Sequence, residues 1–217
     1  MYMCNFLSPQ NNLKLIKISH KNPQKMSKYK EIKHHFLQHS QVVSDSFNSI
    51  AGQLESISEI LSTSLNRGGT IIFCGNGGSA ADSQHLAAEF VGRFSSDRRA
   101  LRSISLSTDT SVITCISNDY SYEDVFSRQI SALARPGDIL IAISTSGNSP
   151  NIINAVKKAN KLNCSTIAFI GRNGGKLKDY AEHSLIVPSD DTARIQEVHI
   201  LLGHILCNLV EINMGFA

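Results

Sequence analysis

The residues of this 217-residue chain best suited to chemistry are polar groups set in two otherwise apolar helical segments. In the segment Ser-Ala-Ala-Asp-Ser-Gln-His-Leu-Ala-Ala-Glu-Phe, His85 and Glu89 are four residues apart and therefore share one face of a predicted helix. A second such segment, near the C-terminus, offers Gln196, His199 and His204. An imidazole beside a carboxylate can bind a metal or transfer protons, so these residues indicate an enzyme.

A cluster of hydroxyl side chains follows a continuous apolar strand predicted over Asp138–Ile143. The turn Ser144-Thr145-Ser146-Gly147-Asn148-Ser149 leads into a helix, where free N–H groups and the helix dipole favour an anion. It lacks the lysine of a GxxxxGK[ST] loop, which disfavours a nucleoside triphosphate. Plain helix capping by Ser and Asn is the alternative, but four clustered hydroxyls favour a phosphate monoester.

A glycine-rich turn, Cys74-Gly75-Asn76-Gly77-Gly78-Ser79, follows another predicted strand. It nominally satisfies the dinucleotide-binding pattern G-x-G-x-x-A. A dinucleotide site requires an acidic residue for the ribose about 20 residues further on, whereas Asp109 comes about 30 residues after the turn. We therefore expect Asn76, Gly77, Gly78 and Ser79 to hold the hydroxyl groups of a sugar.

Short apolar strands alternate with helices along the chain, after one long amphipathic helix over Ser27–Asn66. Apolar strands that alternate with helices predict a parallel sheet covered on both faces, with ligands at the carboxyl ends of its strands. The strands are expected at Thr70–Cys74, Ser103–Leu106, Asp138–Ile143, Thr166–Ile170 and His183–Val187. The helices between and after them are expected at Ala80–Phe94, Thr110–Ile116, Tyr122–Ala134, Asn151–Leu162 and Thr192–Asn213.

Composition and charge exclude several classes of protein. The chain is 41% hydrophobic with a net charge of +3, and its first 26 residues carry four lysines and no acid. The remainder is thus close to neutral, which disfavours nucleic-acid binding. The five cysteines are scattered and odd in number, as in a cytosolic protein with reduced thiols. No apolar run is expected to reach the roughly 18 residues of a membrane helix. Residues 1–26 are expected to be a disordered extension of one domain over 27–217.

Five motifs in a fixed order carry a resemblance to a known family: Cys-Gly-Asn-Gly-Gly-Ser, Gln-His-x-x-x-Glu, Ser-Asn-Asp, Ile-Ser-Thr-Ser-Gly-Asn-Ser and Arg-Ile-Gln-Glu-x-His-x-x-x-x-His. From about Lys28 to the C-terminus the chain resembles the phosphoheptose isomerases of the sugar-isomerase (SIS) domain family. The resemblance implies one SIS domain, an α/β flavodoxin-like three-layer sandwich with a long N-terminal helix. It also implies a cytoplasmic homotetramer with active sites at subunit contacts.

The activity that the resemblance implies is conversion of sedoheptulose 7-phosphate to D-glycero-D-manno-heptose 7-phosphate through an enediol. This would be the first step toward an ADP-heptose precursor of lipopolysaccharide or another surface polysaccharide. Glu89 and His204 would be the acid–base pair, and one zinc ion per subunit would be held by His85, Glu89, Gln196 and His204. The substrate would contact Asn76, Gly77, Gly78, Ser79, Glu89, Asn118, Asp119, Ser144, Thr145, Ser146, Ser149 and Gln196.

Two points qualify this interpretation. A related SIS protein, the bacterial DnaA initiator-associating protein, shares most of the motifs but lacks the equivalents of Glu89 and His204. A non-catalytic sugar-phosphate-binding module is therefore the alternative. In addition, Gln196 and His204 are eight residues apart, about 12 Å along a straight helix. Both reach one ion only if it lies between them or if a neighbouring subunit contributes. His199 is expected to have a structural role.

Overall fold

The computed structural model describes residues 23–217, with side chains from residue 28 onward. It divides into a unit ending at His35 and a compact unit over Phe36–Ala217. The first helix, α1 (Pro23–Asn66), begins four residues before the predicted start, with proline in the first helical position, where its fixed φ suits a helix. Of the expected disordered extension, residues 1–22 lie outside the described part.

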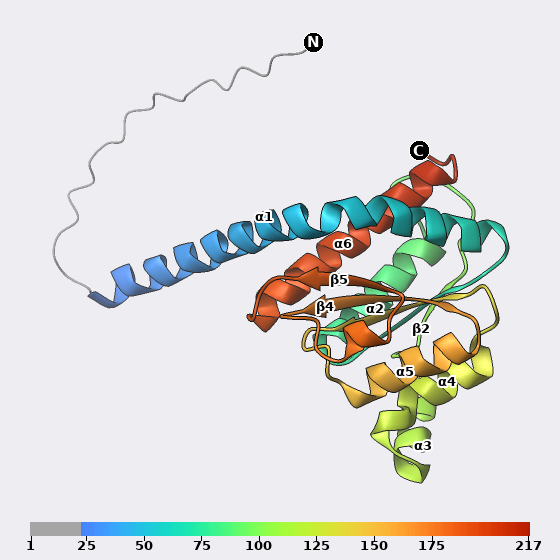
Figure 1. The fold of residues 1–217 in the computed structure, drawn as a ribbon. Coiled ribbons are helices and arrows are strands. Elements are labelled where there is room, and N and C mark those ends of the chain that lie inside the picture. The colour runs from blue at the N-terminus through green and yellow to red at the C-terminus, as the bar shows by residue number, and fades with distance from the viewer. Residues whose placement is uncertain (1–22) are drawn as a thin grey trace. The chain divides into compact units, whose positions relative to one another are not determined.

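The five predicted strands form one parallel sheet, which confirms the α/β class (Figure 1). Its order is β2-β1-β3-β4-β5, the flavodoxin-like arrangement whose ligand crevice lies between the carboxyl ends of β1 and β3. The strands are β1 (Ile71–Gly75), β2 (Ser103–Ser105), β3 (Ile139–Ser144), β4 (Ser165–Gly171) and β5 (His183–Val187).

The helices follow the predicted order, with some corrected boundaries. They are α2 (Gly78–Val91), α3 (Thr110–Asp119), α4 (Val125–Leu133), α5 (Pro150–Lys161) and α6 (Thr192–Asn213), with short 3-10 helices η1 (Tyr122–Asp124) and η2 (Leu177–Asp179). The prediction that α2 continues to Phe94 is wrong, because Gly92 leaves helical geometry. The predicted helix over Tyr122–Ala134 is a 3-10 turn followed by the shorter α4. Helix α3 continues three residues beyond the predicted end at Ile116.

Alternate residues of the buried strands pack on opposite faces of the sheet. Phe73 and Ile141 belong to the core shared with α1, α2 and α6, whereas Cys74 and Ala142 belong to the core shared with α3, α4 and α5. This is the period of two that a strand imposes on its side chains. Figure 1 shows the same layers, with α4 and α5 on one side of the sheet and α6 on the other.

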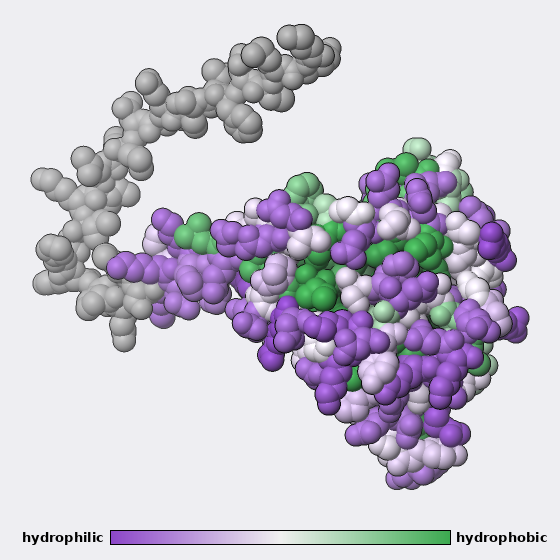
Figure 2. Space-filling model, viewed as in Figure 1, coloured by the Kyte–Doolittle hydropathy of each residue, from purple (hydrophilic) through white to green (hydrophobic). Residues whose placement is uncertain are grey.

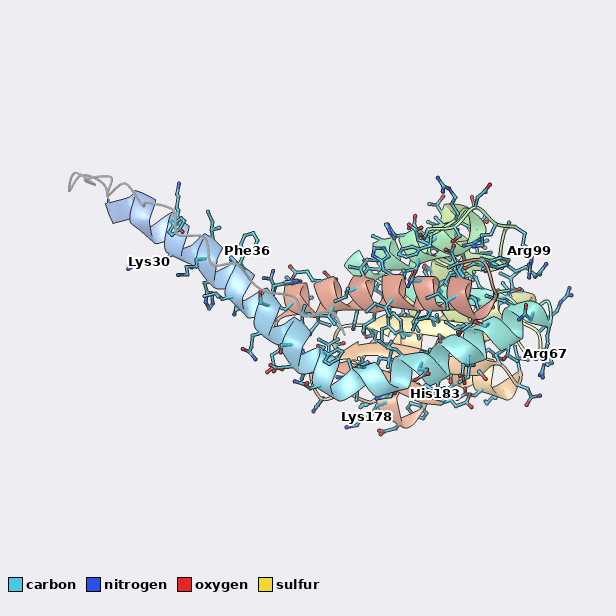
Figure 3. The ribbon with its side chains drawn as sticks, turned by 90° about the horizontal axis from the view of Figure 1, so that it is seen from above. Lys30, Phe36, Arg67, Arg99, Lys178 and His183 are labelled. Carbon is cyan, nitrogen blue, oxygen red and sulfur yellow. The ribbon has the colours of Figure 1, made fainter. Side chains whose placement is uncertain are left out.

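Helix α6 is a core helix. Among the described helices it is the one whose length and composition would allow it to cross a membrane, but half of its most apolar stretch is buried within the domain, as in a core helix. The part of α1 from Phe36 onward lies alongside α6 (Figure 3): His39 contacts Glu197 at 2.7 Å and Asn213 donates to Ser58 at 2.9 Å.

Candidate active site

Helices α2 and α6 run side by side in the same direction and bring distant polar residues together. Near the start of both helices, Gly78 faces Gln196, and a Cβ on Gly78 would come within 2.4 Å of the Gln196 amide nitrogen. Two turns further on, Gly203 leaves room for Leu86, whose Cδ2 would lie 2.4 Å from an added Cβ. The close approach at these two glycines therefore sets the spacing of the helix pair.

At the level of Leu86 and Gly203, the structure brings together His85, Glu89 and His204, the histidine–glutamate trio. The two Nε2 atoms of His85 and His204 are 2.9 Å apart, and His85 Nε2 lies 3.3 Å from Glu89 Oε1. One donor atom from each side chain lies within 4.8 Å of the others. The side chain of His85 is half exposed and that of Glu89 a quarter exposed, so the trio is open to a ligand.

The donor set of the trio fits a zinc ion. Two imidazole nitrogens and a carboxylate oxygen are ligands that zinc accepts, and Zn–N bonds of about 2.0–2.1 Å place tetrahedral donors roughly 3.3 Å apart. The spacings of 2.9 and 3.3 Å are close to that value. Three protein ligands leave a fourth position free, as in catalytic zinc sites. Gln196 lies at Gly78 rather than with the trio.

The hydroxyl turn Ser144–Ser149 lies where β3 ends, beside the end of β1. Ser144 Oγ accepts from the Gly147 N–H at 3.2 Å and lies 3.4 Å from Ser149 Oγ. Within the described residues the Ser149 side chain makes no capping hydrogen bond to α5, so simple helix capping does not account for it. Gly147 has a φ of +65°, and an added Cβ would lie 2.2 Å from the Gly174 carbonyl oxygen.

The side chain of Asn76 ties the two turns together. Its amide donates to Asn151 Oδ1 at 2.9 Å and its oxygen accepts from Asn151 Nδ2 at 2.9 Å and from the Tyr122 hydroxyl at 3.0 Å. Asn151 is buried at the start of α5, directly after the hydroxyl turn. Asn76 therefore fixes the distance between the glycine turn and the hydroxyl turn.

Of the remaining predicted substrate contacts, Thr145 and Ser146 lie half-buried in the hydroxyl turn, and Ser79 is buried in the first turn of α2 beside the exposed Gly77. Asn118 and Asp119 lie exposed at the end of α3. In the part of the chain that is described, the Asn118 amide donates to Asp119 at 2.8 Å, and neither side chain bonds to a turn or to the trio.

His199 lies on α6 between Gln196 and His204 and is fully buried. Burial lowers the pKa of its imidazole from 6.5 to about 4, against a smaller opposing effect of the Ile170 backbone. Neither ring nitrogen has a partner with hydrogen-bond geometry among the described residues, and the ring packs 6.0 Å from that of Phe169. These contacts agree with the structural role expected for it.

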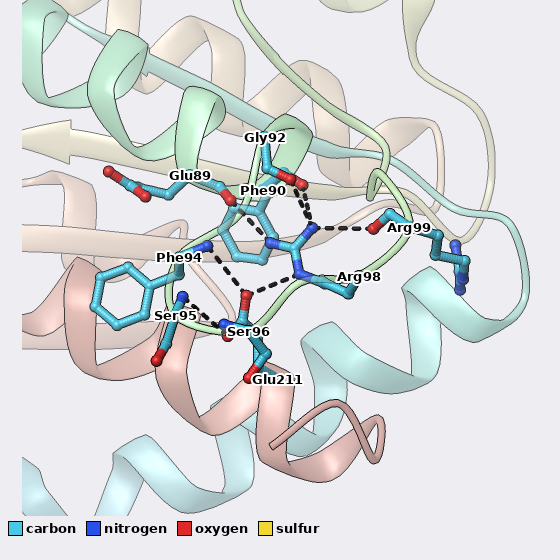
Figure 4. A network of polar contacts seen from close by, with 9 residues as sticks. All are labelled: Glu89, Phe90, Gly92, Phe94, Ser95, Ser96, Arg98, Arg99 and Glu211. Carbon is cyan, nitrogen blue, oxygen red and sulfur yellow. Dashed lines mark hydrogen bonds and ion pairs between the residues drawn. The ribbon is translucent and has the colours of Figure 1, made fainter.

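Two polar residues near the site, Arg98 and Glu211, were not expected from the sequence. Arg98 and Glu211 form an ion pair of 2.8 Å whose side chains are each 1% exposed (Figure 4). Arg98 stands in the string Asp97-Arg98-Arg99, which has the composition of a solvated loop. Glu211 could have been noticed, because it is an acid in the apolar second half of α6, seven residues after His204.

The fold and site define a class: an α/β protein whose strand order reverses between β1 and β3, with a polar trio on two covering helices. A family model of the SIS domain matches residues 34–171. The chain is 51% identical to a phosphoheptose isomerase of Aliarcobacter butzleri, over 81% of this chain and 93% of that protein. It is 55% identical to one from Aquifex aeolicus, over 74% and 84% of the two chains.

Solved structures agree. A phosphoheptose isomerase from Neisseria gonorrhoeae is 41% identical with a TM-score of 0.79, and one from Francisella tularensis is 33% identical with a TM-score of 0.83. Each comparison covers 85% of this chain and 98% of the other. The chain therefore belongs to the phosphoheptose isomerase family of SIS-domain proteins.

Proposed function

We propose that this chain interconverts sedoheptulose 7-phosphate and D-glycero-D-manno-heptose 7-phosphate, with Glu89 and His204 as its acid–base pair. The observation that carries the proposal is the meeting of these two side chains with His85 in one accessible trio, although they come from helices far apart in the sequence. The alternative, a non-catalytic module that binds the replication initiator, is not favoured, because the trio is complete and the relatives above are named as isomerases.

The reaction moves one proton between two carbons and one between two oxygens. Glu89 removes a proton from C1 of the ketose while protonated His204 donates a proton to O2, which gives the enediol. His204 then takes the proton from O1 as Glu89 delivers a proton to C2, which gives the aldose and restores both groups. The hydroxyl turn holds the phosphate with the side chains of Ser144, Ser149 and their neighbours. Gln196 and the glycine turn hold the sugar hydroxyls.

We propose His85, Glu89 and His204 as ligands of one zinc ion per subunit. When bound, zinc supplies a Lewis acid that stabilises the charge of the enediolate. Gln196 would complete the ligand set only from a neighbouring copy or after a rearrangement, since it lies at Gly78. Metal analysis of dialysed wild-type protein and His85→Ala tests this: one equivalent bound by the wild type and a large loss in the variant are expected. Equal retention would contradict the assignment.

We further propose that the active site is shared between subunits of a homotetramer. Glu89 lies eleven residues after Gly78, about 16 Å further along α2 and away from the turns. A groove between α1 and α6 is lined by Val43, Leu201 and the 71% exposed Phe47, and hydrophobic surface is visible where α1 passes α6 (Figure 2). A second copy packed on this groove would bury its apolar side chains.

The activity test uses purified protein and sedoheptulose 7-phosphate, with and without a chelator. Product that disappears with chelator and returns with zinc is expected, and absence of product under all conditions would contradict the function. The shared site is tested by co-expressing Glu89→Gln with Ser144→Ala/Ser149→Ala. Activity above that of either variant alone is expected. In mixed oligomers, some subunit contacts pair the intact trio of one variant with the intact hydroxyl turn of the other. Activity no greater than their sum would place the site within one chain.

The product is a heptose phosphate, and we place it at the entry to ADP-heptose synthesis for lipopolysaccharide or another surface polysaccharide in the cytoplasm. Deletion of the gene, followed by mass spectrometry of the surface glycans, is the corresponding test. Loss of heptose is expected, and unchanged heptose content would contradict this placement.

A further inference from the structure

The Arg98–Glu211 pair lies at the far end of the α2–α6 contact and joins three segments (Figure 4). Glu211 is on α6, seven residues after His204, and hence on nearly the same helix face. Its carboxylate accepts the backbone N–H groups of Phe94, Ser95 and Ser96 at 2.9–3.1 Å. One side chain of α6 therefore holds the loop that follows α2.

Arg98 closes the network from the other side. Its guanidinium donates to the backbone carbonyls of Glu89 at 2.8 Å, Phe90 at 2.9 Å and Gly92 at 3.2 Å, as well as to Glu211. These are the carbonyls at the C-terminal end of α2, which have no partner within the helix. The residue that supplies the proposed base, Glu89, is thus bonded through its own backbone to this buried ion pair.

The loop also reaches the imidazole of His204. The ring of Phe94 lies 5.5 Å from that of His204, with 36° between their planes. Burial would raise the pKa of Glu211, but the three N–H donors and Arg98 outweigh it and hold that pKa below its ordinary value. A buried charge with this many partners has one favourable arrangement, so the network is suited to fix a geometry.

We propose that Arg98 and Glu211 are positioning residues of the isomerase: they lock the C-terminal end of α2 and Phe94 against α6, and so hold Glu89 and His204 in reacting alignment. This inference rests on the proposed function for its kinetic consequence. Neither residue bonds to a side chain of the trio in the part of the chain that is described. They act through the Glu89 backbone and the Phe94 ring.

The test compares Arg98→Met/Glu211→Leu with Asp138→Asn. The double variant replaces the ion pair by apolar side chains of similar size, a change that buried pairs often tolerate. Asp138 is also buried and accepts two backbone N–H groups, from Thr70 at 2.7 Å and Arg135 at 2.8 Å, but it lies just before β3, at the amino ends of the strands. Asp138→Asn therefore serves as the control: it should destabilise the fold without altering the α2–α6 contact, and so it shows how a loss of stability alone affects kcat.

In the double variant we expect kcat to fall by roughly 10- to 100-fold, as for a misplacement of about 1 Å, with KM unchanged because the turns are intact. The His204 ring signals in the NMR spectrum should shift as the Phe94 ring moves away. Asp138→Asn should melt at a lower temperature with the kcat and His204 signals of the wild type. A folded double variant with wild-type kcat and His204 signals would overturn the inference, as would an equal kcat loss in Asp138→Asn.

The two proposals fail differently. If the wild type has no isomerase activity, the proposed function falls and the NMR comparison alone decides the positioning role. If the double variant does not fold, Glu211→Gln, which keeps the side-chain shape, takes its place in the same measurements with the same expected changes.

Discussion

The turns at the carboxyl ends of β1 and β3 differ from the trio on α2 and α6 in how they are built. The hydroxyl turn is a run of consecutive residues, held by its own hydrogen bonds and by the Asn76–Asn151 amide pair. In the trio, His85 and His204 are 119 residues apart and meet because two helices pack closely at Gly203. The proposed binding groups thus come from local sequence, and the proposed reacting groups from tertiary packing.

The difference has a functional consequence. A turn can be tuned for phosphate without disturbing the core, whereas the trio is only as precise as the helix contact that carries it. The distance along α2 between Gly78 and Glu89 separates the two regions within one chain. Substitutions should therefore change KM and kcat separately, depending on the region in which they fall.

The largest effect is expected from the trio. Glu89→Gln and His204→Ala should each lower kcat by about 10²- to 10⁴-fold, the usual contribution of general acid–base catalysis, with little change in melting temperature. Steady-state kinetics and thermal melts measure both. Exposed Glu55→Gln on α1 is the matched control and should retain full activity. Near-wild-type kcat in either trio variant would remove the acid–base assignment.

The next effect concerns the stability of the fold and involves His199, which lies on α6 between Gln196 and His204. The folded pKa of His199 is about 4 and its ordinary value is 6.5, so between these values only the unfolded chain binds the proton. The free energy of unfolding therefore has its full His199 contribution above pH 6.5. It decreases as pH falls toward 4, by up to about 3 kcal/mol in total. Urea unfolding of wild type and His199→Leu at pH 7 and 4.5 measures it. The same pH slope in both proteins would contradict the shift.

A smaller effect, on binding rather than turnover, is expected from the hydroxyl turn. Ser149→Ala should raise KM by roughly 10- to 100-fold, because a hydrogen bond to a charged group contributes about 1.5–3 kcal/mol. The kcat at saturating substrate should change much less. Ser131→Ala, on the exposed side of α4, serves as control. A loss confined to kcat would mean that the turn does not hold the phosphate.

The smallest effect tests the helix contact itself. Gly203→Ala should push Leu86 and α2 away from α6 and lower kcat by up to about tenfold, less than the roughly 100-fold that a misplacement of 1 Å can cause. Gly52 on α1 has open space around it, so Gly52→Ala should leave kcat unchanged and slightly stabilise the helix. If both variants keep wild-type kcat, close packing at Gly203 does not control the trio.

Much of this could be predicted from the sequence, where the signal is local. The alternation of apolar runs with helical segments predicted the parallel sheet, and the i, i+4 spacing placed His85 beside Glu89. The partnership with His204 came from the resemblance, because no local pattern links residues 119 positions apart. The end of α2 was predicted three residues late, since Phe94 continues the apolar period. Glu211 draws the loop of residues 94–96 away through backbone bonds that periodicity does not show.

The most direct test of the central claim follows the proton that Glu89 is proposed to move. Wild-type protein is incubated with sedoheptulose 7-phosphate in D₂O, and deuterium at C1 of the ketose and at C2 of the aldose is measured by NMR. The enediol mechanism predicts solvent deuterium at these carbons with the wild type and almost none with Glu89→Gln. Exchange at wild-type rate in Glu89→Gln would contradict the account.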